Sequence, residues 1–433
     1  MKLRSQSCRR LATPAAAMVL LAGCGTATGG GGNASGTTGG GGALASCKGT
    51  ITVASDFPTS GSDASDGVPT ANGAKLAVDQ ANVHRVFGGC LVKYTPLDDA
   101  SLALGKHDPQ KGAQNMTALV GSGAVGVVGP FNSSVAKAEM PIANQAGLVL
   151  ISPSNTNPGL TIPNADPDID AASLRPTGRV TYFRTCSTDI GQGRGFATSA
   201  LGKLHTRTAY VIDDQETYGK GLADQFVRFY EQGGGKVAKR VSLPGTTLDF
   251  RAVLTEAKGL DADLVFFGGT TSNGGGIIRK QMVELNLNAR YEGGAVTDDE
   301  FFVQAGPAGD GAYGGFAAPD VTKLPSASRF LADYRAAFNA EPGVYSANAY
   351  DAMNIILAAA RKVIVDNGGM LPADPAAFRS SVRDAVARTD YNGAIGHTTF
   401  DAAGDTTNLL FTLEVARNQK WVYDSTVQLT ASP

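Results

Sequence analysis

Four polar loops are the parts of this sequence best suited to bind a small molecule. Each follows an apolar, β-type run and is rich in Ser, Thr, Asn or Asp; they span residues 56–66, 132–134, 152–157 and 213–218. The carboxyl ends of parallel strands meet at one edge of an open α/β sheet. We therefore expect these loops to face a common crevice and to offer hydroxyl, amide and carboxylate groups to a polar ligand.

Two serines stand where a predicted helix begins. Ser133 and Ser134 follow the apolar run that ends at Val128. Free backbone N–H groups and the helix dipole favour an anion, such as a carboxylate, at this position. A serine here can instead be an ordinary helix N-cap. The residues alone leave both interpretations open.

Pairs of acidic residues recur after predicted strands, at 98–99, 213–214 and 298–299. Such residues mostly cap helices or start turns. One of them could instead contact the ammonium group of a ligand.

The sequence contains no motif that indicates catalysis. Residues 121–126 (GSGAVG) match the G-x-G-x-x-G spacing, but they end a helix and open a strand, whereas a dinucleotide motif does the reverse. There is no nucleophile elbow, H-E-x-x-H motif or paired-cysteine zinc spacing. The histidines lie far apart, at His84, His107, His205 and His397. We therefore expect no enzyme activity, no metal and no cofactor.

Alternating strands and helices must position the first three loops. Strands are predicted at 50–55, 91–97, 125–128 and 148–151. The helix after the second strand begins at Asp108-Pro109, an N-cap followed by a first-turn proline. This alternation predicts a doubly wound parallel sheet with right-handed crossovers.

The pattern repeats in the second half of the chain. A helix near 195–204 is followed by strands at 209–212, 237–242 and 264–267, with helices between them. A β-rich tail, 398–429, is too short to be a domain and is expected to pair with an earlier sheet. A chain of 433 residues exceeds what one core usually holds, so two α/β lobes are predicted.

The first 23 residues have the character of an export signal. A basic region with four Lys or Arg residues precedes an apolar stretch, 11–21, that is too short to span a bilayer. The stretch ends at Leu21-Ala22-Gly23-Cys24, which resembles the lipobox of bacterial lipoproteins and makes Cys24 the expected lipid-bearing residue. The alternative is a plain secretory signal with a chance cysteine. No other segment has the roughly 18 apolar residues of a membrane helix.

Residues 25–46 are nearly all Gly, Thr, Ala, Asn and Ser, a composition typical of a flexible tether. The chain has 37 basic and 39 acidic side chains, and the signal holds four of the basic ones and none of the acidic ones. The exported part therefore carries a net charge near −6, which argues against a nucleic-acid partner.

Two cysteines are placed to form a disulfide. Cys47 precedes the first predicted strand and Cys90 starts the second, and these strands would be neighbours in a parallel sheet. Two reduced thiols are the alternative, but export favours the bond. Cys186 has no obvious mate and is expected to be a small buried residue.

Four blocks of the chain, in order, resemble the leucine/isoleucine/valine-binding proteins. These are type I periplasmic binding proteins that feed branched-chain amino-acid ABC importers. The blocks are 127–161, 182–193, 210–226 and 345–359, and the similarity extends from residue 50 to 423.

The resemblance implies two α/β lobes joined by three crossovers, near residues 182, 317 and 400. The predicted organisation is a signal at 1–23, a lipidated tether at 24–46, lobe 1 at 47–181 plus 317–399, and lobe 2 at 182–316 plus 400–433.

The resemblance also implies the binding residues. In the family a helix-start serine and a loop after a strand hold the carboxylate of the ligand, which corresponds here to Ser133 and to Ser154, Asn155 and Thr156. A tyrosine of the second lobe corresponds to Tyr218.

The chain departs from the family where the side chain and amine of the ligand are bound. Thr270 stands in place of an aromatic residue, and Asp66 lies at or near another. The ammonium-binding glutamate falls near Ala295, with Asp298 the nearest acidic residue. Leucine is therefore not implied as the ligand, and an amide, a urea-like compound or another carboxylate would fit as well.

The predicted function is capture of a small amino-acid-like ligand between two lobes that close like a hinge. The protein is expected to be a monomer, anchored by lipid on the extracytoplasmic side of the cell membrane, that delivers its ligand to ABC permease subunits. The alternative is an extracellular receptor module that senses amides, urea-like compounds or carboxylates.

Overall fold

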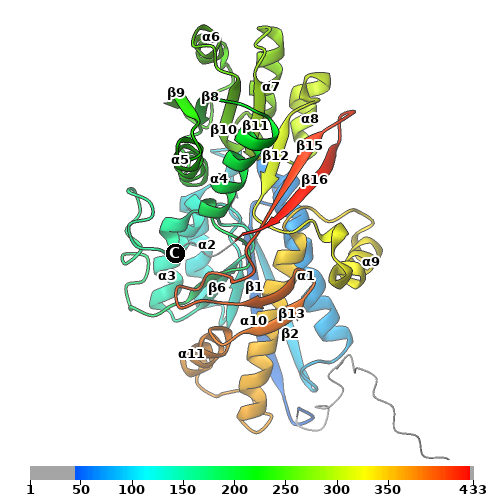
Figure 1. The fold of residues 1–433 in the computed structure, drawn as a ribbon. Helices are drawn as coiled ribbons and strands as arrows, with labels where there is room; N and C mark the ends of the chain where they lie inside the picture. Colours follow the sequence, from blue (N-terminus) through cyan, green and yellow to red (C-terminus); the bar gives the residue numbers. More distant parts are fainter. Residues whose placement is uncertain (1–43, 430–433) are drawn as a thin grey trace, which may run out of the picture. The chain divides into compact units, whose positions relative to one another are not determined.

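A computed structural model describes residues 44–429 of the chain. The predicted signal, the lipid-bearing Cys24 and nearly all of the tether lie outside the described residues. Two large sheets, each packed between helices, make up the described fold (Figure 1).

The first sheet has five parallel strands in the order β2-β1-β5-β6-β7. The strand order shows that the chain starts inside the sheet and adds strands on both sides, as expected of a doubly wound fold. The strands are β1 (Gly49–Phe57), β2 (Cys90–Asp98), β5 (Gly126–Val128), β6 (Val149–Ser152) and β7 (Tyr182–Arg184).

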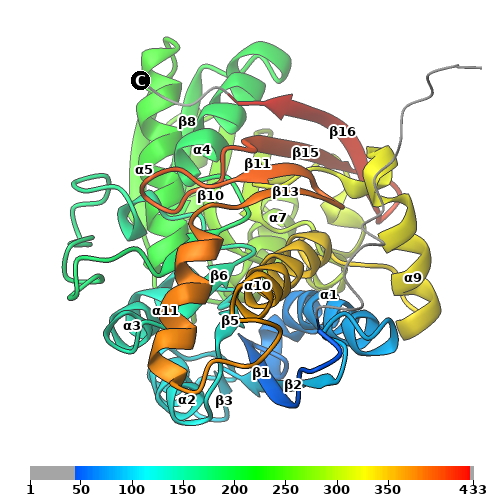
Figure 2. The same cartoon turned by 90° about the horizontal axis from the view of Figure 1, so that it is seen from below.

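Two hydrophobic clusters cover the two faces of this sheet. Along β5, Val127 packs into the cluster with α2 and α3, and Val128 packs into the cluster with α1 and α10. Figure 2 shows α1 and α10 side by side. The helices are α1 (Ala64–Val83), α2 (Pro109–Gly121), α3 (Ser133–Gln145), α9 (Ser328–Phe338), α10 (Ser346–Asp366) and α11 (Pro375–Val386).

The second sheet has seven strands in the order β16-β15-β12-β11-β10-β8-β9. β15 pairs antiparallel with both β12 and β16, so the prediction that the tail returns to an earlier sheet is confirmed. The strands are β8 (Thr208–Asp213), β9 (Lys236–Ser242), β10 (Leu264–Thr270), β11 (Arg290–Ala295), β12 (Tyr313–Phe316), β15 (Leu410–Ala416) and β16 (Trp421–Gln428).

Five helices surround the second sheet: α4 (Asp189–Thr198), α5 (Thr217–Gln232), α6 (Arg251–Gly259), α7 (Gly275–Glu284) and α8 (Glu300–Ala305). A helix was predicted to begin near residue 195, but α4 begins at Asp189, so the predicted start was wrong. The glycines in this segment are needed for close packing and do not prevent the helix from forming. A Cβ on Gly193 would lie 2.6 Å from the backbone of Gln225, and one on Gly195 would lie 2.3 Å from the ring of Phe411.

Three connections join the sheets. β7 still pairs with β6, so the chain leaves the five-stranded sheet only after Arg184. The predicted boundary at residue 182 therefore falls inside that sheet. It returns after Phe316 and crosses again before Leu410. The division of the chain into two lobes stays a prediction. None of the helices between residues 44 and 429 combines the length and the apolar character needed to cross a bilayer.

Cys47 and Cys90 form a disulfide at the amino ends of β1 and β2, with their Cα atoms 5.2 Å apart. The pairing of Gly49 with Cys90 in the sheet places the two cysteines next to each other. Cys186 is a buried free thiol. Short hairpins complete the described fold: β3 (Ala100–Ser101) with β4 (Lys106–His107), and β13 (Asp390–Gly393) with β14 (Gly396–Thr399).

Candidate functional site

Ser133 lies at the carboxyl end of β5 and is the first residue of α3. The N-cap is Asn132, so the interpretation of Ser133 as an ordinary N-cap is wrong. The Ser133 side chain is 2% exposed, and its Oγ accepts a long hydrogen bond of 3.5 Å from the N–H of Asn157. The first N–H groups of a helix have no intrahelical acceptor. This helix end therefore offers a hydroxyl and backbone donors to an anion.

The loop after β6 is tied to the end of β5. Ser154 Oγ and Asn155 Nδ2 both donate to the carbonyl of Phe131, at 2.9 and 2.7 Å. Ser152 Oγ accepts from the N–H groups of Ser154 and Asn155. The side chains of Ser154 and Asn155 are thus engaged in shaping the loop.

Thr156 differs from its two neighbours in the loop. Its side chain is 1% exposed, and its hydroxyl lies within reach of the buried Asp189 carboxyl but makes no hydrogen bond of good geometry. A buried hydroxyl without a partner costs free energy unless something binds it. Among the predicted residues of these two loops, Ser133 and Thr156 are therefore the ones whose hydroxyls are least engaged by the protein.

Arg184 is the last residue of β7, and its side chain holds the backbone of the same loop. It is fully buried, and its Nη1 donates to the carbonyls of Asn155 and Asn157, each at 2.9 Å. Its Nε pairs with Asp405 at 2.6 Å, and its Nη2 donates to Thr161. Sequence reasoning assigned Arg184 no role, although it lies in the block 182–193. The only signal was an arginine directly after an apolar strand.

Tyr218 and Asp189 come from the helices of the second sheet. Tyr218 lies in the first turn of α5, and Asn157 Nδ2 donates to the carbonyl of the preceding Thr217 at 2.8 Å. Burial raises the pKa of Tyr218 well above its usual value, and the charge of Asp189 adds to the rise. The loop that holds Thr156 therefore lies against the start of α5.

Asp189 is a functional candidate that sequence reasoning missed. It is fully buried, its N–H donates to the carbonyl of Thr156 at 2.8 Å, and its Oδ2 has no hydrogen-bond partner. Burial raises its pKa to about 7, although Thr156 lies close enough to oppose the rise. A buried carboxyl with a free oxygen beside Tyr218 can accept a hydrogen bond from a ligand.

Asp66 and Asp298 are near enough for the charge of Asp298 to act on Asp66. Burial, then the charges of Asp298 and Asp63, raise the pKa of Asp66 well above its usual value. Burial also raises the pKa of Asp298 to about 6. Asp66 belongs to α1 and Asp298 follows β11, so these carboxyls come from opposite sheets. Thr270 ends β10, and its hydroxyl bonds that of Ser272 at 2.9 Å.

Tyr345 links these two groups of residues. Its hydroxyl accepts from the N–H of Ala317 at 3.1 Å, and its ring meets that of Phe131 edge-on, with centroids 5.7 Å apart. Burial raises its pKa, and the charges of Asp189 and Asp66 are among the further causes. The charges of both Asp189 and Asp66 therefore act on Tyr345. It was in the block 345–359 but had no assigned role.

The acidic pairs mostly cap helices or start turns, as one of the two predicted alternatives had it. Asp98 accepts from the N–H groups of Thr59 and Ala100, and Asp298 Oδ1 accepts from the N–H of Phe301 in α8. A carboxylate with two oxygens can cap a helix with one and still meet a ligand with the other.

A second group of acidic residues comes from β1, from the end of β2 and from α3. Asp56, Asp99 and Glu139 are all fully buried. Neither oxygen of Asp99 has a hydrogen-bond partner, whereas the carboxyls of Asp56 and Glu139 lie within hydrogen-bonding reach of each other. Burial raises the pKa of Asp56 to about 7 and that of Glu139 well above its usual value, and each is raised further by neighbouring carboxylate charge. Within residues 44–429 no group of His, Cys, Asp or Glu side chains is arranged to hold a metal ion. Because burial and neighbouring carboxylate charge raise their pKa values, these three carboxyls favour their protonated forms.

Glu139→Gln is expected to raise the free energy of unfolding at about pH 8 by on the order of 2 kcal/mol, and to change it little near pH 4. Because burial raises the folded-state pKa of Glu139, its protonated carboxyl contributes its full stability below about pH 4, and that contribution is lost as the pH rises through the raised pKa. The amide cannot ionise. Urea unfolding across this range tests the prediction, with the exposed Glu231→Gln on α5 as control. A gain from Glu139→Gln that is equal at all pH values would contradict it.

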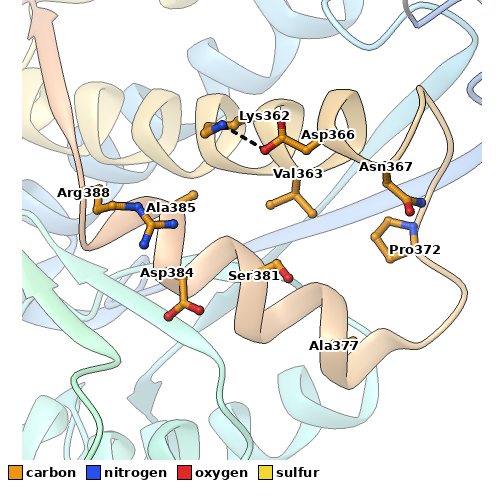
Figure 3. Close-up of a pocket in the computed structure, with 10 residues that line it drawn as sticks. All are labelled: Lys362, Val363, Asp366, Asn367, Pro372, Ala377, Ser381, Asp384, Ala385 and Arg388. Carbon is orange, nitrogen blue, oxygen red and sulfur yellow. Dashed lines mark hydrogen bonds and ion pairs between the residues drawn. The ribbon is translucent and has the colours of Figure 1, made fainter.

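A surface groove between α10 and α11 is lined by other residues. Figure 3 shows its side chains, which include the ion pair of Lys362 with Asp366 at 2.9 Å. None of the predicted binding residues lines this groove.

Comparisons with known proteins agree with this architecture. The family model described as "Periplasmic binding protein" matches residues 50–420. The Leu/Ile/Val-binding protein BraC3 of Rhizobium johnstonii is 31% identical over 368 residues, which cover 84% of this chain and 90% of that protein.

Solved structures are similar as well. The branched-chain amino-acid transporter substrate-binding protein LivJ of Streptococcus pneumoniae, in complex with isoleucine, has a TM-score of 0.71 and 26% identity, over 87% of this chain and 100% of that one. A solute-binding protein of R. palustris in complex with benzoate has a TM-score of 0.69 and 22% identity, over 86% of this chain and 95% of that one.

Proposed function

This chain belongs to the periplasmic binding protein family, and from that premise we propose that it is the solute-binding lipoprotein of an ABC importer. Its ligand is a small amino-acid-like molecule with a carboxylate. The family consists of solute-binding proteins, and the proposed function involves binding and release without a covalent step.

The observation that carries the proposal is the pair of hydroxyls at the ends of β5 and β6. Ser133 is buried at a helix start, and Thr156 is buried with a hydroxyl that makes no hydrogen bond of good geometry and lies within reach of Asp189. Both lie on backbone that Ser154, Asn155 and Arg184 fix in place. Prearranged donors at a helix N-terminus suit a carboxylate, because they need no reorganisation when it binds.

The remainder of the site favours a ligand that carries a polar group in addition to its carboxylate. The charge of Asp298 acts on Asp66, and the Thr270 hydroxyl bonds that of Ser272. Two carboxylates whose charges repel each other are stabilised by an ammonium or amide N–H of a ligand. A ligand with an amine, amide or urea-like group opposite its carboxylate therefore fits better than a purely apolar acid.

The proposed location is the outer face of the cell membrane, with a lipid on Cys24. That residue lies outside the described part of the chain, and this part of the proposal depends on the sequence Leu21-Ala22-Gly23-Cys24 and the Gly-rich segment that follows.

A thermal-shift screen tests the function. We expect an amino acid, an amide-bearing acid or an aromatic acid to raise the melting temperature by about 3 °C at a concentration of roughly 100 times its Kd, because only the folded protein binds it. Leucine, isoleucine, valine, urea and benzoate belong in the panel. The matched control for each active ligand is its analogue without the carboxylate. An equal shift with that analogue, or no shift with any carboxylate, would contradict the proposal.

A further inference from the structure

Six polar residues connect the loops of the two sheets directly; we call them the bridge cluster. Asp63 lies just before α1, and Lys106 and His107 form β4, all on the side of the five-stranded sheet. Glu216 and Asp214 lie between β8 and α5, and Asn273 lies just before α7, on the side of the seven-stranded sheet.

The contacts across the bridge cluster are short. Lys106 Nζ donates to Glu216 Oε1 at 3.0 Å and to Asn273 Oδ1 at 2.7 Å. His107 Nδ1 lies 2.5 Å from Asp63 Oδ2 on its own side, and its Nε2 lies 3.7 Å from Glu216 Oε2 on the other side. Each cation therefore reaches across to Glu216.

Contacts behind these pairs hold the second side in place. Asn273 Nδ2 donates to Asp214 Oδ2 at 2.8 Å, and Asp214 Oδ1 accepts from the N–H of Glu216 at 3.0 Å. The side-chain amide of Asn273 thus accepts a hydrogen bond from Lys106 through its oxygen and donates one to Asp214 through its nitrogen. The whole set is made of protein groups, so it does not require a ligand.

Burial and charge make these contacts strong. Lys106 and His107 are 8% and 3% exposed, and Asp63 is 6% exposed. Despite burial, the hydrogen bonds and charges of Asp63 and Glu216 raise the pKa of His107 to about 10, and the pKa values of Asp63 and Glu216 fall to about 2. Two cations therefore face two anions at neutral pH, in the well-paired geometry that a buried ion pair needs.

On three segments of the chain, a residue of the bridge cluster lies two or three positions away from a candidate binding residue. Asp63 precedes Asp66 by three residues, Glu216 precedes Tyr218 by two, and Asn273 follows Thr270 by three. A change in the bridge cluster therefore acts on the segments that carry these candidate binding residues.

We propose that Lys106 and His107 form a latch that holds the facing loops of the two sheets together before ligand binds, and thereby positions Asp66, Tyr218 and Thr270. The consequence is a larger fraction of protein in the binding-competent arrangement. Apparent affinity scales with that fraction. The latch goes beyond the proposed function because it acts without ligand.

Hydrogen exchange of the ligand-free full chain tests the latch. Lys106→Met keeps the aliphatic stem and removes the charge, and we expect amides in segments 63–70 and 214–218 to exchange about tenfold faster. Lys239→Met is the matched control, because Lys239 pairs with Glu256 on the seven-stranded side only. It should leave both segments unchanged.

Glu216→Gln removes the partner from the other side and should produce the same local increase, so the test does not depend on one variant folding. Combining Lys106→Met with Glu216→Gln should add less than the sum of the two effects, as expected for residues in contact. Unchanged exchange in both segments, or an equal increase throughout both sheets, would overturn the latch. Since no ligand is used, its failure is separate from a failure of the thermal-shift screen.

Discussion

Replacing Ser133 and Thr156 together by alanine is expected to weaken binding of the cognate carboxylate by more than about a hundredfold. Each hydrogen bond to a charged group contributes about 1.5–3 kcal/mol, and two are removed. Stability should change little, because the Thr156 hydroxyl makes no hydrogen bond of good geometry and Ser133 Oγ accepts only one long hydrogen bond. Binding and folding are therefore separable at this site.

Isothermal calorimetry with a ligand from the thermal-shift screen measures the loss. The matched control is Ser173→Ala with Thr255→Ala, two exposed hydroxyls that bond only to backbone carbonyls. An affinity of the Ser133 and Thr156 variant equal to that of the control would exclude this carboxylate subsite. The interpretation requires that the melting temperature without ligand stays close to that of the unmodified protein.

Arg184→Met is expected to lower the free energy of unfolding by about 3–5 kcal/mol, because it leaves a buried carboxylate without its partner. Asp405 loses the 2.6 Å contact to Nε, and the carbonyls of Asn155 and Asn157 lose their donor. The loop that carries Thr156 would then be less ordered. Ligand affinity should fall together with stability.

Chemical denaturation compares this variant with Arg240→Met. Arg240 also pairs with a buried aspartate, Asp213, at 2.9 Å, but its own side chain is 25% exposed, so solvent reaches the site and the loss should be smaller. Adding Asp405→Asn to Arg184→Met should recover part of the lost stability, because no unpaired charge is then buried. A loss no larger than that of Arg240→Met would show that the buried pair is not the source of stability.

Local signals predicted much of the fold. Asp108 accepts from the N–H groups of Gln110 and Lys111, so the cap inferred from Asp108-Pro109 is present. The strands around the first three loops appear within one or two residues of their predicted places, because short buried β-type runs between helical segments have few alternatives. The start of α4 was missed because its glycines are required by neighbours far away in sequence.

The candidate site was predictable only in part. Ser133 and the loop at 152–157 follow strands, and a rule about strand ends locates them. Arg184, Asp189 and Tyr345 depend on partners such as Asp405 and Ala317 that no local pattern identifies. The bridge cluster has the same origin, since Lys106 meets a residue 167 positions away.

The disulfide has a mechanical consequence. Any pull on the chain from its N-terminal side reaches the fold at the buried Leu44 and then at Cys47, just ahead of β1. Because Cys47 is bonded to Cys90, the load passes into two strands instead of one. β1 and β2 run parallel and in register from Gly49–Cys90 to Phe57–Asp98, so the two strands bear the load together and β1 passes it to β5 in the middle of the sheet. The domain is thereby suited to hang from its own N-terminus.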